Sequence, residues 1–102
     1  MLKQQLKKDD VIVFRTVGSD EVICKLVEES EYNYVVSKPL ALAMGPSGMG
    51  MTAYMLMADS DTDFVFDKKV IITVAKANKQ AADVYTQSTS KIVQPSKPSI
   101  IT

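Results

Sequence analysis

The stretch that decides the fold is VIVFRTV-GSD-EVICKLVEE, which spans residues 11–29. Its first seven residues are largely β-branched or aromatic on both faces, which favours a strand that is buried on most of both sides. The turn cluster at 18–20 predicts that the rest folds back as an antiparallel hairpin. In that second strand Val22, Cys24 and Leu26 alternate with charged residues, which predicts one face in the core and one in water.

Three more strand patterns follow, over residues 32–43, 51–58 and 69–75. The first is long and contains Pro39, which cannot donate a ladder hydrogen bond and therefore predicts a bend or a sheet edge. A long strand bent in its middle is what a small barrel needs to turn a corner. Residues 51–58 place methionines on one face, which suits either the core or a subunit contact, and the sequence leaves both open.

Helical patterns are predicted at both ends. Leu2 and Leu6 are spaced i,i+4 and would share one face of a short helix over residues 2–8. Asn78 is a plausible N-cap for a second helix over residues 79–88.

Together these patterns predict a mainly β fold, a small five-stranded and strongly bent antiparallel barrel with a short N-terminal and a C-terminal helix. Residues 1–89 would form one domain and residues 90–102 a flexible tail with little apolar pattern. A chain of 102 residues buries only roughly 60–65% of its unfolded surface, so its stability is expected to be shared with partners. The sequence shows no signal core, no membrane-spanning apolar run and one cysteine, which predicts a reducing, cytoplasmic compartment.

Net charge is zero, but the charges are sorted along the chain. Residues 1–8 carry +3, residues 9–67 carry −8 and residues 68–102 carry +5. A fold that gathers both ends on one side would have a basic and an acidic face. Solvated charges of both signs are the plain alternative.

Little in the composition supports catalysis. Without any histidine to activate it, Cys24 is better interpreted as a small buried hydrophobe than as a nucleophile. The glycines of 44–50 lack the lysine of a phosphate-binding loop and predict an ordinary hairpin connection. The aspartates of 59–63 resemble the start of a calcium loop, but Phe64 and Val70 stand at its glycine and glutamate positions. We therefore expect no enzyme activity, no cofactor and no metal site.

The order of elements resembles the Sm/LSm family, closest to uncharacterised Sm-like proteins of tailed phages, over roughly residues 2–76. Val17-Gly18 ends the first strand as Sm proteins often do, and residues 22–26 resemble the second-strand motif with Cys24 in place of glycine. Asn33 stands at the position of the family's RNA-contacting asparagine, although the aspartate expected just before this run is absent.

The second family motif, a basic residue followed by glycine before the last strand, has no direct match. The connection Asp59 to Lys68 opens with aspartates, whereas Lys76-Ala77-Asn78 is chemically similar but follows the predicted last strand. Either the strand count is wrong by one, or half of the family's pocket is missing.

The resemblance implies a non-catalytic homo-oligomeric ring of roughly five to seven subunits that binds single-stranded nucleic acid, RNA more than DNA. Tyr32 and Asn33 would stack on and hydrogen-bond to bases, and backbone contacts would come from Lys38, Lys76 and Asn78. Packing within the strand is the alternative role for each tyrosine. The rival function is a structural or protein-interaction ring, for example in phage assembly, which the neutral charge and the single arginine favour.

Overall fold

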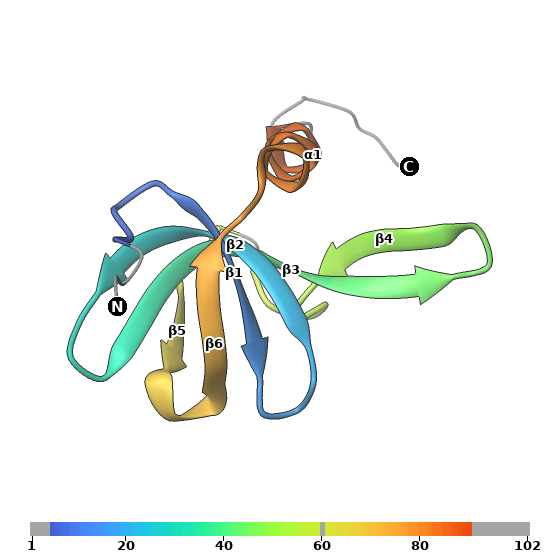
Figure 1. Cartoon of the computed structure of the whole chain (residues 1–102). Coiled ribbons are helices and arrows are strands. Elements are labelled where there is room, and N and C mark those ends of the chain that lie inside the picture. Colours follow the sequence, from blue (N-terminus) through green and yellow to red (C-terminus); the bar gives the residue numbers. More distant parts are fainter. Residues whose placement is uncertain (1–4, 60, 91–102) are drawn as a thin grey trace.

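The computed structural model describes residues 5–59 and 61–90 (Figure 1). The fold is mainly β, with an antiparallel sheet and one C-terminal helix. Its elements are β1 (Val11–Thr16), β2 (Glu21–Glu29), β3 (Asn33–Gly45), β4 (Gly48–Ala53), β5 (Phe64–Asp67), the 3-10 turn η1 (Lys68–Val70), β6 (Ile71–Lys76) and α1 (Lys79–Ser90). The strands follow the order β4-β3-β2-β1-β6, and β5 also pairs with β3.

The decisive hairpin forms as its sequence predicts. β1 and β2 pair antiparallel with Phe14 opposite Val22 and Ile12 opposite Cys24. Ser19 takes a left-handed φ of 75° in the turn, where the 18–20 cluster was expected to reverse the chain. The buried cluster found in the described chain contains Ile12, Phe14, Val22, Cys24, Leu26, Tyr34, Val36 and Phe66. The first five of these side chains come from this hairpin.

Strand β3 is bent, and the bend lies where Pro39 predicted it. Its first half pairs with β5 and its second half with β4, so two strands share one edge of β3. Between the two halves Lys38 has a φ of 48°, a left-handed conformation that a side chain other than glycine adopts only at a cost. The bend turns the second half of β3 away from the core.

The predictions for the N-terminal helix and for the extent of the strand over residues 51–58 are wrong. Residues 5–8 of the expected N-terminal helix are not helical, and residues 2–4 lie outside the described residues. Leu6 instead packs partly buried against the core, and Lys7 and Asp10 exchange hydrogen bonds in a turn. One i,i+4 leucine pair is too little to offset the cost of starting a helix.

The predicted strand over 51–58 ends early, at Ala53, and a sixth strand follows it. The backbone N–H of Tyr54 still donates to the Pro39 carbonyl at 3.0 Å, and its ring packs 5.3 Å from the ring of Phe66. Residues 64–67, which were expected to belong to a connection, form strand β5, which pairs with β3. The sheet is not closed, because within the described chain β5 pairs with β3, β6 pairs with β1, and no ladder joins β5 to β6.

Helix α1 begins as the sequence predicts. The side-chain oxygen of Asn78 accepts a hydrogen bond of 2.8 Å from the Ala81 N–H, as an N-cap does. The helix lies at the upper end of the sheet in Figure 1 and buries Tyr85, whose hydroxyl donates to the carbonyls of Ser37 (3.1 Å) and Lys38 (2.9 Å). The tail beyond it, predicted to be flexible, lies outside the described residues.

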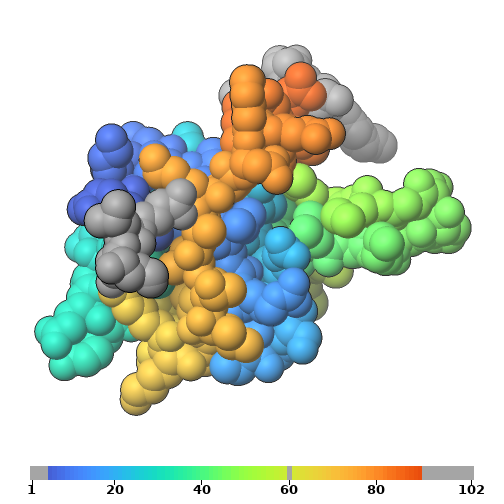
Figure 2. Space-filling model, viewed as in Figure 1, coloured from blue at the N-terminus to red at the C-terminus, as the bar shows by residue number. Residues whose placement is uncertain are grey.

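The second half of β3 and β4 form a projecting hairpin, residues 41–53, which we call the arm. Figures 1 and 2 show it extending to the right of the main body. At its end Met44 pairs with Met49, and their side chains are 79% and 66% exposed. The glycine-rich segment is therefore a tight hairpin connection, and the methionines there are not part of the core of this chain.

Candidate functional site

The two residues singled out for base contacts lie where the turn after β2 meets η1. Tyr32 is 66% exposed, and Asn33 begins β3 opposite Asp67 of β5. The backbone groups of Asn33 make the turn contacts with Ser30, and in the described part of the chain no hydrogen bond engages its carboxamide. An exposed ring and an amide without a hydrogen-bond partner among the described residues thus follow one another at this turn.

A lysine from a distant part of the sequence completes this site. The backbone N–H of Lys68 donates 2.8 Å to the carbonyl of Tyr32, which fixes η1 against the turn. The Lys68 ammonium lies 4.9 Å from the centroid of the Tyr34 ring and 2.7 Å from Oε2 of Glu29. We call Glu29, Tyr32, Asn33, Tyr34 and Lys68 the turn cluster.

The charges of the turn cluster stabilise one another. The hydrogen bond to Glu29 raises the pKa of Lys68, and the burial of that ammonium opposes the rise only in part. Partial burial raises the pKa of Tyr34, and the nearby Glu29 adds to the effect. At neutral pH the cluster therefore holds the charged ammonium of Lys68 beside the neutral phenol of Tyr34. These groups suit stacking and phosphate contact.

Lys38, predicted as a backbone contact, lies apart from the turn cluster at the bend of β3. Its ammonium is 3.7 Å from Oδ1 of Asp61, and its carbonyl accepts the Tyr85 hydroxyl. The Lys38 side chain is therefore paired with the acidic loop after the arm, and its backbone carbonyl is bound by α1.

Lys76 and Asn78 lie at the opposite end of β6 from η1. Lys76 pairs with Ile12 and its ammonium is 3.8 Å from Oδ2 of Asp10, while Asn78 caps α1. The six residues of β6 place them roughly 20 Å from the turn cluster along the strand. The structure therefore brings together Tyr32 and Asn33 but not the other three predicted site residues.

Lys68 was missed because its partners are far away in sequence. Glu29 is 39 positions from it, and no local pattern links the two. A weak signal was available in Asp67, whose carboxylate caps η1 by accepting from the Lys69 N–H at 2.9 Å. An aspartate before two lysines, directly after the alternating Phe64-Val65-Phe66, is consistent with a strand ending in a basic turn.

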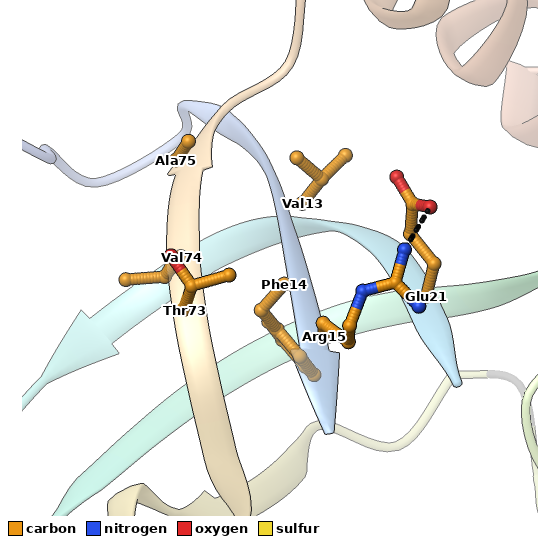
Figure 3. A pocket seen from close by; sticks show the side chains of 7 residues that line it. All are labelled: Val13, Phe14, Arg15, Glu21, Thr73, Val74 and Ala75. Carbon is orange, nitrogen blue, oxygen red and sulfur yellow. Dashed lines mark hydrogen bonds and ion pairs between the residues drawn. The ribbon is translucent and has the colours of Figure 1, made fainter. Parts of the chain in front are cut away.

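A shallow pocket of about 180 Å³ lies on the outer side of β1 and β6 (Figure 3). Figure 3 shows the guanidinium of Arg15 joined to the carboxylate of Glu21, while Thr73 and Ala75 of β6 line the other side of the pocket. The two charged groups lie 3.3 Å apart and neutralise each other. The remaining lining is aliphatic or aromatic, apart from the hydroxyl of Thr73.

An apolar hollow of about 310 Å³ lies at the base of the arm. It is lined by Pro39, Leu40, Ala53, Tyr54, Met55, Leu56, Ala58 and Phe64, with Lys38 and Thr89 at its rim. Residues 39–58 contain no charged side chain, and Met57 beside the hollow is 99% exposed. A surface of this kind favours contact with another apolar surface.

The aspartate-rich loop makes its own turn. Oδ1 of Asp59 accepts from the Asp61 N–H at 3.0 Å, and no group of three or more histidine, cysteine or acidic residues in the described chain is arranged to hold a metal ion. No helix in residues 5–59 or 61–90 is long and apolar enough to cross a membrane. The chain matches no protein-family model, and a search of curated proteins gives no match.

Proposed function

We propose that this chain is an Sm-like subunit that assembles into a homo-oligomeric ring and binds single-stranded nucleic acid without catalysis. The observation that carries the proposal is the turn cluster, in which an exposed Tyr32, the amide of Asn33 and the ammonium of Lys68 lie at one end of the sheet. A single strand needs π-faces for its bases, amides for base edges and cations for its phosphates, and the cluster offers one of each.

The order of elements supports an Sm-like assignment. A long bent β3 follows the β1–β2 hairpin, and the last strand returns to pair with β1. The turn before that last strand is η1, which carries Lys68 and Lys69. In Sm proteins the turn before the last strand carries a basic residue followed by glycine; here two lysines stand at this turn, and no glycine follows them.

Assembly is supported by strand edges that the described residues leave unpaired. β4 and β6 end the main path of strands, and each has an edge without a partner among the described residues. Free edges next to apolar side chains pair readily with other chains. Head-to-tail pairing of such edges closes into a ring when the rotation between subunits permits it.

A ring would also explain how a site of low affinity could bind a nucleic acid stably. Each base–aromatic stack contributes roughly 1–3 kcal/mol, which is too little for stable binding at one site. Repetition of the turn cluster once per subunit would let one strand engage several clusters and raise the overall affinity.

The test is fluorescence anisotropy with labelled oligo-U and oligo-A at two salt concentrations. Wild-type protein is compared with Tyr32→Ala/Asn33→Ala and with the control Val17→Ala, an exposed apolar residue in the other turn. We expect the double variant alone to lose binding, and we expect added salt to weaken wild-type binding. Folded wild-type protein that binds neither oligonucleotide at low salt would contradict the proposal.

The second candidate is a structural or protein-interaction ring. The uncharged stretch 39–58 and the zero net charge favour it, because nucleic-acid binders are usually more basic. An oligomer in light scattering that lacks bound nucleic acid, and whose anisotropy signal is unaffected by the double variant, would support this function instead.

A further inference from the structure

The turn cluster contains a group that competes with a ligand phosphate for Lys68. The Lys68 ammonium, the cation of the cluster, is bound at 2.7 Å by the carboxylate of Glu29. A carboxylate and a phosphate oxygen bind a lysine ammonium through the same charge-assisted contact. A strand that brings its phosphate to Lys68 must therefore displace Glu29 or share the ammonium with it.

Lys68 does not depend on Glu29 alone for its position. Its backbone N–H is bound to the Tyr32 carbonyl, and its ammonium lies over the ring of Tyr34. Neither contact involves the carboxylate of Glu29. Without the charge of Glu29, the side chain would then stay in the cluster with its ammonium open to another anion.

A second acidic residue adds to the effect of Glu29. Glu31 lies close enough to act on the charge of Lys68. Two carboxylates near one ammonium repel a polyanion unless one of them is neutralised.

We propose that Glu29 is the residue that sets the affinity and the salt dependence of the turn cluster, because it occupies Lys68 in competition with the phosphate of a single-stranded nucleic acid. The proposal rests on the proposed function. It gives Glu29 a competing role, and it predicts that loss of this one negative charge strengthens binding.

The experiment measures labelled oligo-U binding by anisotropy for wild type, Glu29→Gln and Glu21→Gln. Glu21→Gln is a matched control, since it removes the same charge from another exposed ion pair, with Arg15 at 3.3 Å, away from the cluster. We expect Glu29→Gln to bind about two- to fivefold more tightly per site than Glu21→Gln, the range expected for an exposed ion pair. Its affinity should also fall more steeply with salt, because one more phosphate contact is formed.

Circular dichroism establishes that each variant is folded, and Glu29→Ala provides a second variant that cannot hydrogen-bond to Lys68 through an amide. If wild type binds and both Glu29 variants equal Glu21→Gln or bind more weakly, the competing role of Glu29 is wrong and the proposed function stands. If neither wild type nor the folded Glu29 variants bind at low salt, both the proposed function and this inference are wrong.

Discussion

The attachment of α1 depends on one side chain, and this can be tested by substitution. Tyr85 is 1% exposed and is the buried residue that α1 contributes. An isolated helix of 12 residues is only marginally stable in water, so α1 needs this tertiary contact to persist. Replacement of Tyr85 should therefore destabilise the chain and lower its helix content.

The expected magnitudes follow from the contacts. Tyr85→Phe removes a hydroxyl that donates to the carbonyls of Ser37 and Lys38, and it should cost about 1–2 kcal/mol because those partly buried carbonyls lose their donor. Tyr85→Ala also removes the buried ring and should cost about 3–5 kcal/mol. Val84→Ala, at a half-exposed neighbour on the same helix, should stay within about 0.5 kcal/mol of wild type.

The assay is urea unfolding followed by circular dichroism at one fixed protein concentration, since assembly makes stability depend on concentration. Agreement between Tyr85→Phe and wild type would show that the two hydrogen bonds contribute nothing net. A Tyr85→Ala variant no less stable than Val84→Ala would refute the reasoning that the ring holds α1 on the sheet.

Two further predictions concern the arm and the buried thiol. In the proposed ring, Met44→Lys/Met49→Lys should break subunit contacts and give folded monomers, because it places charges on the exposed apolar end of the arm; an unchanged mass in light scattering would count against the arm as an interface. Burial raises the pKa of Cys24 from 9.0 to about 12, so above pH 9 the unfolded thiol ionises while the folded one stays protonated. Stability should then fall by up to about 1.4 kcal/mol per pH unit between pH 9 and 12, and Cys24→Ala should flatten this slope in urea titrations; equal slopes would contradict it.

The parts of the fold that local sequence determines were predicted correctly. The hairpin of residues 11–29 is specified by a turn cluster between two β-rich runs, and its partner strands are adjacent in the chain. The bend near Pro39 and the cap at Asn78 each depend on the chemistry of one residue. Such features need no knowledge of distant contacts.

The parts that failed depend on contacts between distant segments. β5 has four residues and follows an aspartate-rich loop, and it becomes a strand because β3 offers an edge some thirty positions earlier. The same pairing brings Lys68 to Tyr32 and Asn33, so the tyrosine and the asparagine of the cluster were predicted and its cation was not. The resemblance supplied the position of Asn33. Lys76 and Asn78 were chosen for their chemical similarity to the second family motif, and Lys38 was chosen as a cation able to contact the backbone.

The arm has a consequence for how this chain can change over generations. None of its residues, 41–53, belongs to the buried core found in the described part of the chain. In the proposed ring, substitutions in the arm would alter the free energy of association more than the free energy of unfolding, provided that Gly48, the turn glycine with a φ of 117°, is kept. Chains that keep the same folded body would then differ most in the partners that the arm contacts.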